Sequence, residues 1–141
     1  MSAIIHAVYP VASGDYTRAG EASADIKRKL KQLGVNSTVL RRIAVASYEV
    51  ELNLVIHSMG GELILEVDAS GIILTSQDVG PGIPNIEMAM KEGYSTASEE
   101  ARSMGFGAGM GLPNMKRNAD GFEIESDAGK GTRISMRFAL C

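Results

Sequence analysis

The clustering of its glycines constrains the fold of this chain most. The 141 residues include 16 glycines, and many of these are gathered in two short stretches. The stretches hold Gly80, Gly82 and Gly93, and then Gly105, Gly107, Gly109 and Gly111. Apolar residues flank both stretches, so we interpret them as loops inside a domain and not as linkers. Clustered glycine is typical of loops that need positive φ or that bring the backbone close to a ligand.

Length, charge and cysteine content predict a single domain over residues 1–141. The net charge is 14 − 17 = −3, which disfavours a broad nucleic-acid-binding surface. Cys141 is the only cysteine, so neither an intrachain disulfide nor a cysteine zinc cluster can form. No apolar run approaches the roughly 18–20 residues of a membrane span, and no basic segment precedes the apolar N-terminal stretch. We therefore expect a cytoplasmic protein with no direct contact to membrane or nucleic acid.

Hydrophobic periodicity predicts helices that alternate with β-hairpins. The expected elements are a strand over 3–9, helices over 16–33 and 38–59, a hairpin of 62–68 with 71–77, a short helix over 85–92, a loop over 94–111, a helix over 112–119, and a hairpin of 122–127 with 132–140. Hairpins imply antiparallel pairing, and amphipathic helices need a surface on which to bury their apolar faces. We therefore expect an α+β fold: a two-layer α/β sandwich whose mixed, mostly antiparallel sheet is covered by helices on one face.

The second predicted helix carries a polar stripe on an otherwise apolar segment. Glu49, Asn53 and His57 follow one another at four-residue steps, so they lie on one side of the helix. A carboxylate is rarely buried without a partner, which makes a solvated helix edge one interpretation. Glu51 supplies a separate polar position that points elsewhere, so the stripe is equally consistent with the lining of a cleft.

Two glycine motifs follow predicted strands. Asp78 ends a strand and is followed by Val-Gly-Pro-Gly, which would present its carboxylate into a pocket lined by backbone. The alternative is an ordinary proline–glycine turn. The stretch 129–132 (Gly-Lys-Gly-Thr) predicts a hairpin turn in which Thr132 is the one candidate contact residue.

The stretch 105–112 directly precedes a predicted helix. Backbone amides at a helix N-terminus form an anion site, and glycine lets phosphate oxygens approach closely. The spacing G-x-G-x-G matches neither GxxxxGK[ST] nor a GxGxxG that follows a strand, so neither common phosphate loop is present. A flexible hinge is the alternative interpretation.

Taken in order, these segments resemble the GHKL (histidine-kinase-like) ATPase superfamily. The motifs are E-x3-N-x3-H on a helix, D-x-G-x-G after a strand, G-x-G-x-G-L before a helix, and G-x-G-T between strands. The stretches 91–96, 109–117 and 122–126 look most similar to the anti-sigma regulatory serine/threonine kinases, the branch of the stressosome switch kinase. The resemblance implies a Bergerat-type ATP-binding domain over almost the whole chain.

The resemblance also implies roles for individual residues. Glu49 would be the general base, Asn53 would ligate Mg²⁺, and Asp78 would accept a hydrogen bond from the adenine amino group of ATP. The remaining nucleotide-binding positions that it implies are Gly80, Gly82, Ile83, Tyr94, Ser95, Thr96, Gly107, Ala108, Gly109, Met110, Gly111, Leu112 and Thr132. Two positions stay open: His57 either belongs to the site or packs and caps its helix, and Arg102 is either a γ-phosphate contact in the lid or a solvated surface arginine.

The function implied by the resemblance is an ATP–Mg²⁺-dependent serine/threonine kinase in a partner-switching pathway. Its substrate would be a small antagonist protein of the anti-anti-sigma type, with a sigma factor or phosphatase as a further partner, and it could act as a homodimer. The alternatives are a nucleotide-gated protein-binding module, such as an anti-sigma factor without transfer, and an accessory ATPase. A sensor histidine kinase is disfavoured because the other histidine, His6, lies in a predicted strand.

Overall fold

The structure is a computed structural model that describes residues 5–57, 60–80, 90, 111–127 and 130–140. In chain order its elements are β1 (Ile5–Val11), a 3-10 turn η1 (Tyr16–Arg18), α1 (Glu21–Leu33), α2 (Ser37–His57), β2 (Gly61–Asp68), β3 (Gly71–Asp78), α5 (Gly111–Asn118), β4 (Gly121–Asp127) and β5 (Gly131–Phe138). The helix predicted over 85–92 and most of the loop predicted over 94–111 lie outside the described residues.

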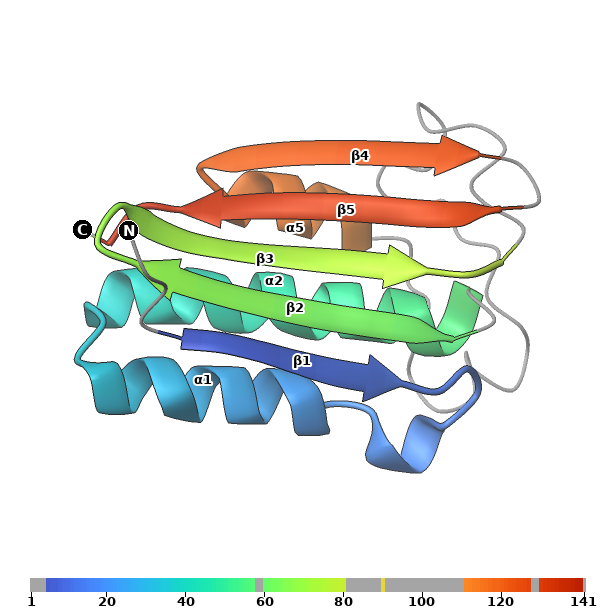
Figure 1. The fold of residues 1–141 in the computed structure, drawn as a ribbon, viewed down its shortest axis with the longest axis horizontal. Helices are drawn as coiled ribbons and strands as arrows, with labels where there is room; N and C mark the ends of the chain where they lie inside the picture. The colour runs from blue at the N-terminus through green and yellow to red at the C-terminus, as the bar shows by residue number, and fades with distance from the viewer. Residues whose placement is uncertain (1–4, 58–59, 81–89, 91–110, 128–129, 141) are drawn as a thin grey trace.

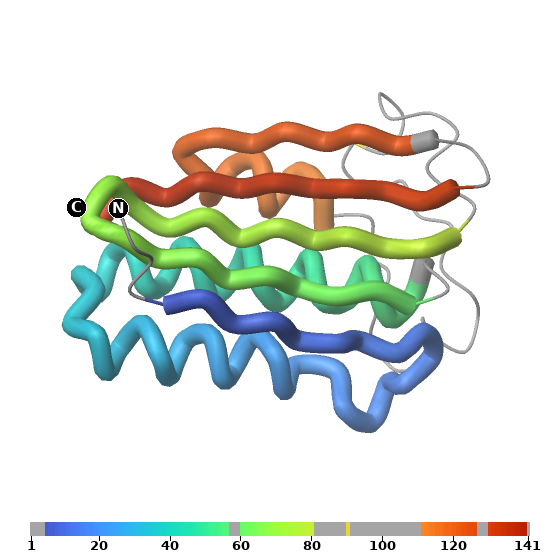
Figure 2. The backbone as a smooth tube through the Cα atoms, viewed as in Figure 1, coloured from blue at the N-terminus to red at the C-terminus, as the bar shows by residue number. Residues whose placement is uncertain are grey.

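The strands form one sheet in the order β1-β2-β3-β5-β4. Each of the four described pairings is antiparallel, which refines the expectation of a mixed, mostly antiparallel sheet. The helices α1, α2 and α5 cover one face of this sheet, and no described element covers the other (Figures 1 and 2). The predicted α+β fold, a two-layer sandwich, is confirmed.

The core lies between the sheet and the helices. Alternate residues of β2, β3 and β5 are buried, as expected for strands with one face toward an apolar layer. Helix α2 supplies fully buried Ile43, Val50 and Leu54, and α1 supplies Ile26 and Leu30. Burial of these side chains fixes α2 against the middle of the sheet, and therefore fixes which side of α2 faces away from the core.

The start of the first helix differs from the prediction. A continuous helix from Tyr16 was expected, but the chain forms the short turn η1 and then reverses at Gly20, whose φ of 100° is in the left-handed region. The backbone N–H groups of Gly20, Ala22 and Ser23 donate to the Glu51 carboxylate at 3.1, 3.1 and 2.9 Å. Backbone N–H groups at a helix N-terminus have no acceptor within their own helix. Here the side-chain oxygens of Glu51 accept from them, in the manner of an N-cap. Glu51 of α2 therefore sets where α1 begins.

We expect Glu51→Gln to destabilise the fold by about 2–3 kcal/mol, because Glu51 is only 2% exposed and a glutamine turns one acceptor oxygen into a donor that faces N–H groups. Urea unfolding followed by circular dichroism measures this. The exposed Glu66→Gln on β2 is the matched control and should change stability by less than about 0.5 kcal/mol. Equal stability of the two variants would contradict the capping role.

Candidate functional site

Glu49 and Asn53 of the polar stripe of α2 face the N-terminus of α5. The Gly111 backbone lies so close that a Cβ there would be 3.2 Å from Asn53 Oδ1 and 3.3 Å from Glu49 Oε2. Residues far apart in sequence are brought together because α2 and α5 pack side by side under the sheet. The N-terminus of a helix carries partial positive charge and backbone N–H donors. This first cluster therefore combines acidic and amide oxygens with a helix N-terminus at which a Cβ would be tightly packed against both of them.

Asn114 also belongs to this first cluster. Its amide Nδ2 donates a long hydrogen bond of 3.4 Å to Glu49 Oε1. Asn114 was not among the predicted site residues. The available signal was its position three residues after Gly111, which puts both residues on the same face of α5.

Burial raises the pKa of the Glu49 carboxyl, and the hydrogen bond from Asn114 opposes that rise. Glu49 is half-buried and lies against a second helix, so it is not part of a fully solvated helix edge. A carboxylate with a raised pKa beside a binding surface is typical of a group that accepts a proton.

A second cluster lies where β3 ends and β5 begins. Asp78 Oδ1 accepts a hydrogen bond of 2.7 Å from the backbone N–H of Thr132. Gly131 has a φ of 136°, and a Cβ there would be 2.3 Å from the Asp78 carbonyl oxygen, so this position requires glycine. The Thr132 hydroxyl is itself 2.9 Å from the Ser126 hydroxyl. The pairing of neighbouring strands thus holds the Asp78 carboxylate in one position.

Partial burial raises the pKa of the Asp78 carboxyl, and its hydrogen bond to the Thr132 backbone lowers it. The chain after Asp78 is held by a hydrogen bond of 3.0 Å from the Val79 N–H to the Gly60 carbonyl, and Gly80 is buried. Asp78 therefore ends a strand with its backbone fixed on both sides, as a side chain that selects a ligand would require.

Both clusters lie toward the same end of the sheet, where β3 ends, β5 begins and the C-terminal half of α2 runs beneath them (Figure 1). The first cluster is in the helix layer and the second is in the sheet. A ligand that spans the two layers at this end would meet the Glu49 and Asn53 oxygens on one side and Asp78 on the other.

Of the other predicted site residues, two lie in the described part of the chain and the rest lie outside it. Leu112 is described and is buried in the core, while His57 is the last residue of α2. The predicted residues that lie outside the described part of the chain are Gly82, Ile83, Tyr94, Ser95, Thr96, Arg102, Gly107, Ala108, Gly109 and Met110.

Within the described residues, no group of three or more histidine, cysteine or acidic side chains could hold a metal ion. A magnesium ion does not need such a group, because it is usually held by one or two protein oxygens together with substrate phosphates and water. The amide oxygen of Asn53, next to the start of α5, fits this pattern. None of the described helices is long and apolar enough to cross a membrane.

Comparison with known proteins shows the family of the chain. The family model for histidine kinase-, DNA gyrase B- and HSP90-like ATPases matches residues 26–140. The chain belongs to this family. This confirms the resemblance to the GHKL superfamily and, with it, ATP as the nucleotide.

Relatives in this family carry informative names. The chain is 35% identical over 108 residues to the serine/threonine-protein kinase RsbT of Bacillus subtilis, covering 74% of this chain and 75% of that protein. It is 33% identical over 121 residues to the anti-sigma F factor of Clostridium kluyveri, covering 82% of each. The anti-sigma F factor of Geobacillus stearothermophilus is 33% identical over 116 residues, covering 78% of this chain and 76% of that protein. Both the kinase and the anti-sigma sides of the predicted branch are thus represented.

The hydrogen bond between Asn114 and Glu49 predicts how Asn114 affects the pKa of the Glu49 carboxyl. We expect Asn114→Leu to raise the pKa of Glu49 further, because it removes the hydrogen bond that opposes the effect of burial while keeping the site packed. Carboxyl-detected ¹³C NMR titration of Glu49 measures this. Asn118→Leu, one turn along α5, is the control and should leave the Glu49 titration unchanged. A downward shift in Asn114→Leu would show that the contact is not the one described.

Proposed function

We propose that this protein is an ATP-dependent serine/threonine kinase that acts on a partner protein in a partner-switching system. The observation that carries the proposal is the first cluster, in which a half-buried carboxylate with a raised pKa and an amide oxygen face the N-terminus of α5. The similarity to the kinase RsbT and to anti-sigma F factors supports it.

ATP would bind across the two clusters. Asp78 would accept a hydrogen bond from the adenine amino group while its Oδ1 stays bonded to the Thr132 backbone. The amide groups at the start of α5, beginning with Gly111, would lie at the phosphates. The same proposed nucleotide pocket includes the other predicted positions: Gly80, Gly82, Ile83, Tyr94, Ser95, Thr96, Gly107, Ala108, Gly109, Met110, Leu112 and Thr132.

Asn53 would hold magnesium, while Glu49 beside it stays free to accept a proton. When bound, this ion neutralises charge on the phosphate oxygens, which is the main catalytic requirement of phosphoryl transfer. The fit rests on hard oxygen donors next to a helix N-terminus, a combination suited to a metal–phosphate pair.

Glu49 would take the proton of the attacking hydroxyl. As the partner's serine or threonine oxygen forms a bond to the γ-phosphorus, the bond from that phosphorus to the β–γ bridging oxygen breaks. ADP leaves, the partner keeps the phosphoryl group, and the proton passes to the Glu49 carboxylate. A raised pKa makes Glu49 a better acceptor for this proton near neutral pH.

The alternatives are less well supported. A module that only binds nucleotide and a partner would not need a carboxylate with a raised pKa at the phosphate end of the site. An accessory ATPase would release phosphate without labelling a protein. Radiolabelled ATP separates the three functions, since label on a partner hydroxyl, free phosphate and no turnover are different products.

The partner belongs to the same proposal. We propose a small antagonist of the anti-anti-sigma type as the acceptor, with a sigma factor or a phosphatase as the protein whose activity is switched. A homodimer and a cytoplasmic location are further parts of it, as is a contact of Arg102 or His57 with the nucleotide.

We expect Glu49→Gln to bind ATP–Mg²⁺ within about threefold of wild type and to lose about 10²–10⁴ in transfer rate, because glutamine keeps the size of the side chain but accepts no proton. Calorimetry measures the binding, and label on proteins that co-purify with the chain measures the transfer. Equal transfer rates in the two proteins would remove Glu49 from the mechanism.

We expect Asp78→Asn to weaken ATP binding about 10- to 100-fold, the equivalent of about 1.5–3 kcal/mol for a hydrogen bond to a charged group. The folded chain should survive, since an asparagine oxygen can still accept from the Thr132 N–H. Asp68→Asn in the β2–β3 turn is the matched control, with unchanged affinity. Unweakened binding by Asp78→Asn in calorimetry would place the adenine elsewhere.

A further inference from the structure

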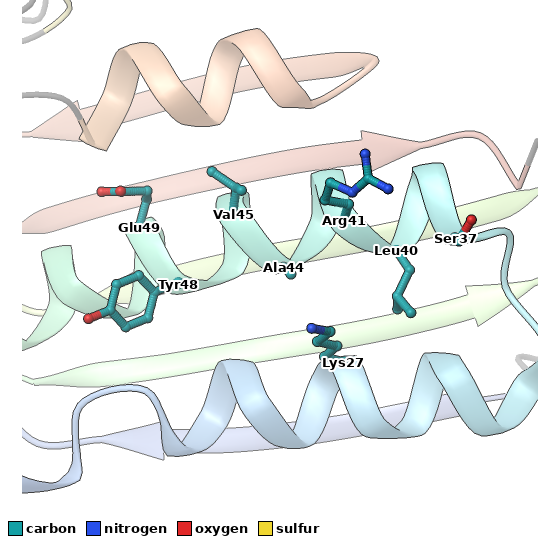
Figure 3. A pocket seen from close by; sticks show the side chains of 8 residues that line it. All are labelled: Lys27, Ser37, Leu40, Arg41, Ala44, Val45, Tyr48 and Glu49. Atoms are coloured by element: carbon teal, nitrogen blue, oxygen red, sulfur yellow. The ribbon is translucent and has the colours of Figure 1, made fainter.

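A pocket of about 530 Å³ lies on the outer surface of the helix layer, between α1 and α2 (Figure 3). Most of its lining comes from α2, and Lys27 of α1 closes it from the other side. Glu49 is one of its lining residues, so the pocket reaches the carboxylate that also contacts α5. Glu49 therefore belongs both to this pocket, which we call the groove, and to the first cluster.

The lining of this groove is ordered along α2. Arg41, Val45 and Glu49 follow one another at four-residue steps and lie in a row in Figure 3. At 1.5 Å of rise per residue, Arg41 and Glu49 are separated by about 12 Å along the helix. The groove thus has a carboxylate at one end and a cation about 12 Å away.

The middle of the groove is apolar and accessible. Val45 is 38% exposed and Tyr48 is 39% exposed, although both are large side chains next to the folded core. Ala44, which also lines the pocket, is small and leaves the space open. An apolar side chain placed here would bury surface that α2 otherwise leaves in water.

The cations of the groove differ from the ion-paired cations of the same helices. Arg28 and Lys29 pair with Asp25, and Arg42 pairs with Asp120. Lys27 and Arg41 are exposed and take part in no ion pair among the described residues. Two uncompensated cations beside an apolar floor attract an acidic partner.

We propose that this groove binds the acceptor segment of the partner protein. The hydroxyl of the acceptor residue lies at Glu49, an apolar side chain packs on Val45 and Tyr48, and an acidic side chain pairs with Arg41 and Lys27. An extended chain advances about 3.3 Å per residue, so the acid stands three or four residues from the acceptor. This inference rests on the kinase function proposed above and adds the chemistry of the segment that it recognises.

Fluorescein-labelled peptides of eleven residues test the groove directly. Each holds one serine, a leucine next to it and an Asp-Glu pair three and four residues from the serine, made in both chain directions. A second set replaces the acidic pair with two lysines. With magnesium and ADP present, fluorescence anisotropy should show that one acidic peptide binds at least about tenfold tighter than its basic counterpart, because two attractive charge pairs replace two repulsive ones.

Variants of the chain then locate the binding. Arg41→Ala should weaken the binding of the acidic peptide severalfold. Arg133→Ala, which removes an exposed cation from β5, should not change the affinity for this peptide. The double variant Lys27→Glu with Arg41→Glu should reverse the order and prefer the basic peptide. An acidic preference that survives this reversal, equal binding of both peptides, or binding of neither would overturn the proposal.

Calorimetry with ATP on the same preparations separates this inference from the proposed function. Magnesium-dependent ATP binding together with no acidic preference would overturn the groove and leave the kinase proposal standing. Absence of ATP binding in the wild-type chain would instead contradict the proposed function itself.

Discussion

The contact between the start of α5 and the polar stripe of α2 is the constraint on which the proposed site depends. A Cβ at Gly111 would lie 3.2 Å from Asn53 Oδ1 and 3.3 Å from Glu49 Oε2, so a larger residue there would have to push these side chains aside. Because Ile43, Val50 and Leu54 fix α2 against the sheet, the stripe must face away from the core. Among the described elements, helix α5 covers Glu49 only in part, so this carboxylate is half-buried.

Two glutamates of α2 show how the environment decides the role of a side chain. Glu49 and Glu51 are two residues apart, so the helix turns them to different sides. Glu51 is almost fully buried and receives three backbone hydrogen bonds, which makes it a structural cap. Among the residues that the structure describes, Glu49 receives one long hydrogen bond, and its burial raises its pKa. A carboxylate that is only partly satisfied remains available for chemistry.

The fold was largely predictable because its signals are local. The alternation in β2 and β3, the glycine that ends α1, and Pro113 in the first turn of α5 are each signals that depend on neighbouring residues only. The cap of α1 was not predictable in this way, since its acceptor, Glu51, is about thirty residues further along the chain than the N–H groups that it receives. The helix was therefore expected to begin too early, at Tyr16.

The site was predictable in its residue types and less so in its contacts. The order of the motifs indicated Glu49, Asn53, Asp78 and Thr132, and the structure joins them in two clusters. The contact of Asn114 with Glu49 depends on how two distant helices pack, which no spacing rule encodes. The groove between α1 and α2 depends in the same way on tertiary packing, because Lys27 and Arg41 look like ordinary surface cations in the sequence.

Amide NMR during titration with ATP and magnesium tests the central claim, a single nucleotide site spanning helix layer and sheet. Gly111 reports on the first cluster and Thr132 on the second. The account predicts that both amide resonances shift with the same dissociation constant, and that omission of magnesium reduces the shift of Gly111 more than that of Thr132. Shifts in only one of the two, or two different dissociation constants, would contradict a single site.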